Sequence, residues 1–239
     1  MSAGTRQKVL LALMGIASLG TTALIAMNVL AHRHVRGRPE GLPGFARFGE
    51  SSTGELPTLG DVPAFVLTDH DMNPVNGEML RGKVWIVDFI FTRCSGPCLR
   101  MNRQMHRLQK MLSDDRPSND VRFLSVSVDP DYDTPQVLRQ YAARHGADTE
   151  TWSFATGPRQ DLRSLVVGGF KLPIEQAGSA EHAILHSDRF VLVDRQGRIR
   201  GYYHGISHEA PDGTILPPET DRLLTDVKKL LATDDASQS

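Results

Sequence analysis

The sequence predicts an α/β domain, in which helices flank a central sheet. Two apolar runs rich in β-forming residues, 83–91 and 121–129, have the composition of strands buried on both faces. A segment with helical signals follows each run. Because strand–helix–strand connections are right-handed, we expect the two runs to lie parallel at the centre of the sheet.

The helical segments have distinct signals. After the first buried run, Met101, Met105, Leu108 and Leu112 recur at helical spacing, which favours core packing over metal binding for the two methionines. After the second run, a Thr-Pro pair supplies an N-cap and a first-turn proline for a helix that reaches about residue 145.

The rest of the domain completes an order of strand, helix, strand, helix, hairpin and helix. Residues 63–69, 151–156 and 188–194 are predicted short strands, and the turn 194–198 makes a hairpin with the strand that follows. The last helix, within 218–232, is amphipathic, with an apolar side formed by Leu223, Leu224, Val227, Leu230 and Leu231.

Composition limits the class of protein. The chain has 239 residues, 40% of them hydrophobic, and a net charge of -1. This length suits one packed domain with an appendage. A near-neutral chain lacks the electrostatic footprint of a nucleic-acid-binding protein. Two cysteines are too few for a disulfide-stapled scaffold.

The appendage is N-terminal. Residues 9–31 contain no charged side chain, and as a helix they would be roughly 34 Å long, enough to span a bilayer. We therefore expect a tail (1–8), a transmembrane anchor (9–31), a tether rich in Gly, Pro, Ser and Arg (32–56), the folded domain (57–232) and a disordered tail (233–239). Cleavage as a signal peptide is the alternative, and the flanking basic residues do not decide the orientation.

Cys94 and Cys98 are the only cysteines, and three residues separate them. The first is predicted at the end of a buried strand and the second in the first turn of a helix, where the helix dipole should make both thiols ionise more easily. Such a pair can close a disulfide or hold one soft metal ion. Inert buried thiols or a structural disulfide over so short a loop fit this location less well.

A Cu(I) site with two thiolates takes a third ligand, often imidazole. His186 lies just ahead of the strand 188–194, on a loop able to fold across the top of the sheet, and His182 is the fallback. His106 is two helical turns beyond the second cysteine, about 12 Å along the axis, and is too far. His204 and His208 follow the hairpin and are expected to be solvated.

Three separated blocks resemble the Sco/SenC family of copper proteins. They are "PAFVLTDHDMNPV" with "LRGKVWIVDFIFTRCSGPC", "SVSVDPDYDTPQVLRQYAARHG", and "HSDRFVLVDRQGRIRGYY". The resemblance spans about residues 57–231 and includes the three-residue spacer between the cysteines. Two departures, Leu99 where the family commonly has proline and a spacer without an acidic residue, leave the metal affinity, redox potential and choice of partner open.

The resemblance implies a thioredoxin-like fold with a mixed sheet, anchored by one transmembrane helix and lying on the extracytoplasmic side. It also implies that Cys94, Cys98 and His186 ligate copper, as Cu(I) or Cu(II). Its expected function is delivery of copper to the binuclear centre in the copper-bearing subunit of cytochrome c oxidase, with a thiol–disulfide reductant as a further partner.

Two enzyme hypotheses remain beside the copper carrier. A thiol–disulfide oxidoreductase would use Cys94 and Cys98 as a redox-active pair without needing His186. A thiol peroxidase is a weaker possibility. Whether the protein is an enzyme at all therefore stays open, and a metallochaperone is the preferred interpretation.

Overall fold

The computed structural model describes residues 55–94, 96–115, 120–172, 176–177, 184–185 and 187–235. The predicted tail 1–8, the predicted anchor 9–31 and nearly all of the predicted tether 32–56 lie outside the described residues. None of the helices within the described ranges is long and apolar enough to cross a bilayer.

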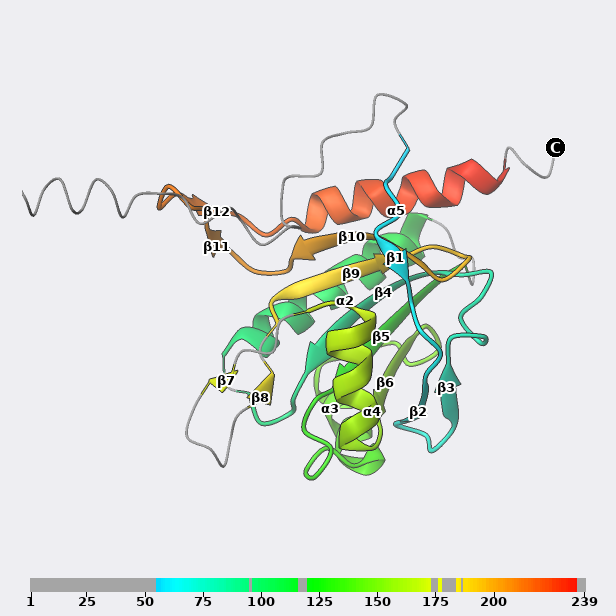
Figure 1. The fold of residues 1–239 in the computed structure, drawn as a ribbon, viewed down its shortest axis with the longest axis vertical. Helices are drawn as coiled ribbons and strands as arrows, with labels where there is room; N and C mark the ends of the chain where they lie inside the picture. The colour runs from blue at the N-terminus through cyan, green and yellow to red at the C-terminus, as the bar shows by residue number, and fades with distance from the viewer. Residues whose placement is uncertain are drawn as a thin grey trace, which may run out of the picture. The chain divides into compact units, whose positions relative to one another are not determined.

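Eight strands form one mixed sheet in the order β1-β10-β9-β4-β5-β6-β2-β3 (Figure 1). The strands are β1 (Gly60–Asp61), β2 (Val66–Asp69), β3 (Pro74–Asn76), β4 (Val84–Ile90), β5 (Val121–Ser127), β6 (Trp152–Thr156), β9 (Arg189–Val193) and β10 (Arg198–His204). Two separate hairpins pair β7 (Gln176–Ala177) with β8 (Ile184–Leu185) and β11 (His208–Glu209) with β12 (Ile215–Leu216). β4 pairs parallel to β5, which confirms the predicted centre, while β9 pairs antiparallel to β4.

Helices cover both faces of the sheet (Figure 1). One face packs against α2 (Pro97–Asp115), α3 (Pro135–Arg144) and α5 (Thr220–Asp235). The other packs against α4 (Arg159–Arg163) and the π-helical turns η1 (Ser164–Gly169) that continue it. The α4–η1 segment was not predicted, because its helical stretch is too short to show a clear period.

Strand β4 contributes to both cores because successive side chains alternate between the faces of a sheet. Ile86 and Ile90 belong to the core beneath α2, whereas Trp85 and Val87 belong to the core beneath α4. By the same alternation Asp88, which is fully buried, points to the α2 side. A carboxyl group therefore lies in the layer between β4 and α2.

The predicted helices are present with the predicted faces. Met101 and Met105 of α2 are buried in the core, together with Leu108 and Leu112, which confirms their packing role. Gly205 faces this layer, and a Cβ there would overlap the sulfur of Met101. The five apolar residues expected on the inner side of the last helix are all buried, and α5 runs to Asp235, three residues into the predicted tail.

The caps of α3 are also those expected from sequence. Thr134 is the N-cap, and its Oγ1 accepts a hydrogen bond from the Val137 N–H at 3.4 Å. Pro135 occupies the first helical position and His145 is the C-cap. The Thr-Pro pair therefore fixes where the chain turns after β5.

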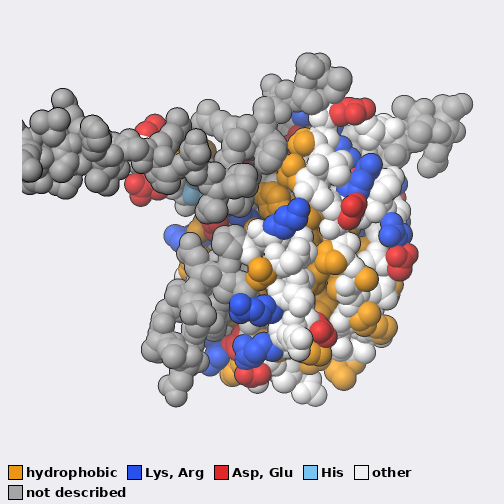
Figure 2. Space-filling view, viewed as in Figure 1, with side chains coloured by type: hydrophobic (Ala, Val, Ile, Leu, Met, Phe, Trp, Pro, Cys, Tyr) orange, Lys and Arg blue, Asp and Glu red, His pale blue; other side chains and the backbone are white. Residues whose placement is uncertain are grey.

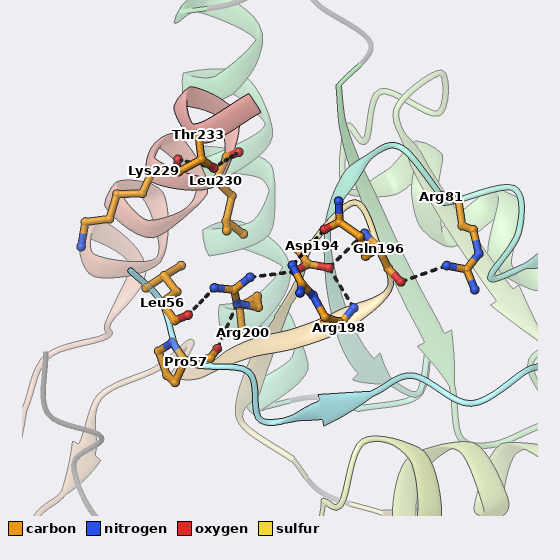
Figure 3. A network of polar contacts seen from close by, with 10 residues as sticks. All are labelled: Leu56, Pro57, Arg81, Asp194, Gln196, Arg198, Arg200, Lys229, Leu230 and Thr233. Carbon is orange, nitrogen blue, oxygen red and sulfur yellow. Dashed lines mark hydrogen bonds and ion pairs between the residues drawn. The ribbon is translucent and has the colours of Figure 1, made fainter. Parts of the chain in front are cut away.

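The start of the domain is bound by Arg200 of β10, which is paired with Asp194 in the turn after β9 (Figure 3). Arg200 donates from Nε to the Pro57 carbonyl at 2.9 Å and from Nη1 to Asp194 Oδ2 at 2.8 Å, and it also contacts the Leu56 carbonyl. Arg198 donates to the same carboxylate at 2.8 Å. Burial opposes ionisation of Asp194, but these hydrogen bonds outweigh it and keep its pKa below the ordinary value.

Large exposed apolar side chains gather elsewhere. Figure 2 shows hydrophobic side chains on the part of the surface that β2 and β3 occupy in Figure 1. Val66, Met72 and Met79, all more than half exposed, belong to this edge hairpin and its flanks. These three residues lie on or beside β2 and β3, whereas the cysteine pair lies between β4 and α2.

Candidate metal and thiol site

The two cysteines occupy the junction between β4 and α2. Cys94 follows the end of β4 by four residues, and Cys98 is the second residue of α2. Both are free thiols, 8% and 5% exposed, and the Cys94 N–H donates to the Phe91 carbonyl at 3.1 Å. The thiol of Cys98 lies close enough to Cys94 and to the backbone of Phe91 for both to act on its pKa. The predicted juxtaposition of the sulfurs is therefore confirmed.

The predicted ease of ionisation is wrong for Cys98. Burial raises the pKa of this thiol above the ordinary value, and the neighbouring Cys94 and Asp88 raise it further, while the hydrogen bond from Phe91 lowers it. The desolvation of the sulfur thus outweighs its position in the first turn of a helix. A metal ion has to displace the proton from this thiol, so its apparent affinity rises with pH.

Two aspartates after β5 hold the residues that precede Cys94. Asp133 accepts from the Thr92 N–H at 3.0 Å, from the Thr92 hydroxyl at 2.5 Å and from the Ser127 hydroxyl at 2.5 Å. Asp129 accepts from Arg93 Nη2 at 2.6 Å. Because Asp129 and Asp133 are buried, these charge-assisted bonds fix the path of the chain into the cysteine pair.

The second block that resembles the Sco/SenC family, "SVSVDPDYDTPQVLRQYAARHG", supplies both of these aspartates. Asp129 and Asp133 were matched only by pattern, and the structure shows that both bind the residues immediately ahead of Cys94. The Arg93 guanidinium also lies 4.5 Å from the ring centroid of exposed Tyr132. No local pattern reveals these partners, because they are about 40 residues apart in the chain.

A polar group lies beneath the thiols. Ser125 donates to Asp88 Oδ1 at 2.6 Å and receives the Trp152 indole N–H at 2.9 Å, whereas Asp88 Oδ2 has no hydrogen-bond partner. Burial raises the pKa of Asp88 to about 7, although the bond from Ser125 lowers it. This carboxyl therefore exchanges its proton near neutral pH, and sequence analysis missed it inside an otherwise apolar strand.

Asn102 and Tyr141 form a second buried polar pair next to the cysteines. Asn102 lies one helical turn after Cys98 and donates from Nδ2 to the Tyr141 hydroxyl, and its own Oδ1 has no partner. Burial raises the pKa of Tyr141, and the proximity of Cys98 and Asp88 raises it further. Two buried oxygens near the thiols, Asp88 Oδ2 and Asn102 Oδ1, are therefore able to accept a hydrogen bond.

The predicted imidazole ligand, His186, and its fallback, His182, lie outside the described residues. The prediction that His204 and His208 are solvated is wrong. The His204 ring is 17% exposed, lies 2.7 Å from Asp188 and stacks on the His208 ring at 3.4 Å between centroids. Both rings are engaged within the fold, so they do not compete for the cysteine site.

The donor set of the pair suits copper. Two adjacent, buried sulfurs form a soft site, and soft thiolate ligands favour Cu(I) among the first-row metals. Elsewhere in the described ranges, no cluster of three or more His, Cys, Asp or Glu side chains is arranged to hold a metal ion. The β4–α2 junction is therefore the candidate site, and a third donor has to come from another segment.

The family model for SCO1/SenC matches residues 57–213. The chain belongs to the SCO1/SenC family. A SCO1 protein homolog of Bacillus subtilis (strain 168) is 33% identical over 156 residues, which cover 65% of this chain and 79% of the relative. A putative copper-binding protein of Stutzerimonas stutzeri is 29% identical over 62% of this chain and 71% of its own length.

Solved structures of Sco proteins share the fold. BsSco, a member of the Sco family of cytochrome c oxidase assembly proteins with a disulfide switch, superposes with a TM-score of 0.61 at 30% identity, covering 73% of this chain and 96% of its own. Yeast Sco1 with copper bound superposes with a TM-score of 0.54 at 20% identity, covering 77% of this chain and 96% of its own. The predicted thioredoxin-like fold with a mixed sheet is thus confirmed for the domain.

Proposed function

We propose that this Sco-family chain binds copper through Cys94, Cys98 and His186 and delivers it to the binuclear copper centre of cytochrome c oxidase during assembly. The observation that carries the proposal is the pair of free, buried, neighbouring thiols at the β4–α2 junction. The copper-bound Sco relatives and the named role of BsSco in oxidase assembly support the cargo and its destination.

The topology supports His186 as the third ligand. β9 pairs antiparallel to β4, with Val87 opposite Val191. The chain that enters β9 at Arg189 therefore approaches the end of β4 from which Cys94 follows. His186 precedes this strand by three residues, a distance that a short loop spans easily.

We also propose that residues 9–31 anchor the protein in a membrane, with the domain on the extracytoplasmic side. The length and apolar character of this segment support the anchor. A reductant in the same compartment would keep the pair in the dithiol form that binds Cu(I), because oxidation to a disulfide removes both thiolate ligands. Protease accessibility of the domain in intact cells and in opened cells tests the orientation.

Anaerobic titration of the full-length chain with Cu(I), against a chelator of known affinity, tests the site. We expect one Cu(I) per chain, loss of binding in Cys94→Ser/Cys98→Ser, and an affinity reduced at least tenfold in His186→Ala. His106→Ala is the matched control, since His106 is exposed on α2 and should leave the affinity unchanged. Undiminished stoichiometry in the double cysteine variant would refute the site.

A thiol–disulfide oxidoreductase is the second candidate, favoured by the buried carboxyl of Asp88 on the α2 side of the sheet, whose Oδ2 has no hydrogen-bond partner among the described residues. A group with a pKa of about 7 can accept the proton that Cys98 releases when it attacks a disulfide. The His186→Ala variant separates the two functions. A copper carrier loses affinity for the metal in this variant, whereas a dithiol reductase keeps its rate of disulfide reduction.

A further inference from the structure

The outer face of α2 is basic along most of its length. The exposed residues Arg100, Arg103, His106, Arg107 and Lys110 succeed one another at spacings of three positions or one, and two non-successive pairs are four positions apart. Such spacings put them on one side of a helix. The inner side of the same helix carries the buried core residues described above, so the division between the faces is complete.

The stability of α2 does not explain this charge pattern. The first turn of the helix contains no acidic residue and the last turn no basic one, while Asp114 lies close to the C-terminal end. A helix dipole favours the opposite arrangement, with acids at the start and bases at the end. Neighbouring cations three or four residues apart also repel one another. The placement of these charges therefore does not stabilise the helix, which points to a role outside the fold.

Most of these cations have no ion-pair partner among the residues that the structure describes. Within the described ranges Arg100, Arg103 and Lys110 form no ion pair, and Arg107 lies 3.5 Å from Asp221 with both side chains exposed. Arg144 at the end of α3 adds to the same region. A Cβ at Gly146, two residues after Arg144, would lie 3.7 Å from His106 Cε1, so the end of α3 lies against this face of α2. Burial, together with Arg144 and Arg103, lowers the pKa of His145.

This basic face begins beside the cysteine pair. Arg100 is two residues beyond Cys98, about 3 Å along the helix axis, and Arg103 is about 7.5 Å along it. The sulfurs are almost fully buried, so any protein that exchanges a metal ion with them has to press against the start of α2. Such a partner necessarily comes within a Debye length of both arginines.

We propose that Arg100 and Arg103 of α2, with Arg144 of α3, form the docking surface for an acidic patch on the protein that exchanges copper with Cys94 and Cys98. The inference rests on the proposed copper function for the identity of that partner. A protein fits this surface better than a lipid bilayer, because only a protein brings its own metal ligands to the sulfurs. Nucleic acid is disfavoured by the net charge of -1, since the basic face is local.

Association between metal-free proteins tests the surface. The full-length chain in detergent micelles is titrated with the isolated copper-bearing domain of the oxidase subunit, at about 10 mM and about 300 mM salt, where the Debye length falls from about 30 Å to well under 10 Å. The test variant is Arg100→Glu/Arg103→Glu. The matched control is Arg163→Glu/Lys171→Glu, which makes the same charge change at exposed positions of α4 and the segment after η1, on the other face of the sheet.

We expect the test variant to bind at least tenfold more weakly than the parent at low salt, with the difference lost at high salt, and the control variant to bind within twofold of the parent. The midpoint of thermal unfolding should stay the same or rise in the test variant, because glutamates suit the start of a helix. Weakened docking therefore cannot be ascribed to unfolding.

Equal losses in the two variants, no salt dependence in the parent, or no association at all would overturn the docking surface. Loss of binding to phosphatidylglycerol vesicles, with association between the proteins unchanged, would also overturn it and identify a lipid occupant. The proposed copper function fails separately. In that case the charge-sensitive association persists, while the parent chain, after incubation with Cu(I), transfers none to the domain.

Discussion

Two buried polar clusters lie at opposite ends of the antiparallel pair β4–β9, and they differ in how completely their hydrogen bonds are satisfied. Asp194, just after β9, accepts bonds from the side chains of Arg198 and Arg200 and from two backbone N–H groups. Asp88, within β4 beside the cysteines, accepts one from Ser125 and leaves Oδ2 without a partner.

The difference separates a structural cluster from a functional one. A saturated carboxylate stays ionised and fixes the chain around it, as Asp194 fixes the entry of the domain through Arg200 (Figure 3). An unsaturated buried carboxyl costs stability and keeps the capacity to bind a proton. Buried carboxyl groups with a shifted pKa are concentrated at functional sites, and Asp88 lies next to the two thiols.

The largest effect is expected at the saturated cluster. Asp194→Ala removes a carboxylate that is 4% exposed in its side chain and leaves the guanidinium of Arg200, 11% exposed, without its ion-pair partner. We expect a loss of about 3–5 kcal/mol of unfolding free energy, measured by urea denaturation, with copper affinity per folded chain unchanged. Glu78→Ala, which breaks an exposed pair with Arg81, should cost less than about 1 kcal/mol. Equal costs would contradict the comparison.

The next effect is a pH dependence at the unsaturated cluster. The pKa of Asp88 is raised from 3.8 to about 7, so between pH 4 and pH 7 the folded state keeps a proton that the unfolded state releases. This group therefore stabilises the fold at low pH, and the stabilisation is lost as pH rises through about 7. The loss amounts to at most about 4 kcal/mol.

Asp88→Asn should flatten this part of the stability curve. Unfolding free energies at pH 5 and pH 8, measured for both proteins, isolate the contribution of the single carboxyl because all other groups are shared. A parent protein whose stability does not fall relative to the variant over this interval would show that Asp88 ionises normally.

A smaller effect is expected at Asp133, which binds both Thr92 and Ser127. Asp133→Ala leaves three donors without their acceptor and should cost roughly 2–3 kcal/mol. It should also weaken Cu(I) binding, since the chain ahead of Cys94 loses its support. Asp131→Ala, two residues away in an exposed pair with Arg159, is the matched control and should alter neither quantity.

The smallest effect is expected at Met101, a soft side chain that lies about one helical turn after Cys98 and packs in the core. Met101→Leu conserves volume and should cost less than about 1.5 kcal/mol. Copper stoichiometry and affinity should remain those of the parent chain. A marked loss of Cu(I) affinity with normal stability would show that Met101 is a copper ligand, which the proposed set of Cys94, Cys98 and His186 does not include.

Much of the fold follows from local patterns. The apolar run of β4, the period of Met101, Met105 and Leu108 in α2, and the Thr134 cap are all readable in sequence because each is decided within one element. The α4–η1 segment and the edge hairpin β2–β3 were incomplete or missing in the prediction, because their short stretches depend on the core they cover.

The candidate site also combines features that can be predicted from local sequence with features that depend on the tertiary fold. The adjacency of Cys94 and Cys98 is local and was predicted correctly, whereas the raised pKa of Cys98 depends on burial beneath packed elements. Asp88 lies in a run that reads as apolar, and nothing in that run reveals that Ser125 is its neighbour. The direct bonds of Asp129 and Asp133 to the loop before Cys94 likewise need the tertiary fold.

X-ray absorption at the copper edge of the full-length chain, loaded anaerobically with one equivalent of Cu(I), tests the central claim most directly. We expect two sulfur donors and one imidazole nitrogen, with the nitrogen lost in His186→Ala and retained in His106→Ala. A spectrum with sulfur donors alone, unchanged in His186→Ala, would contradict it.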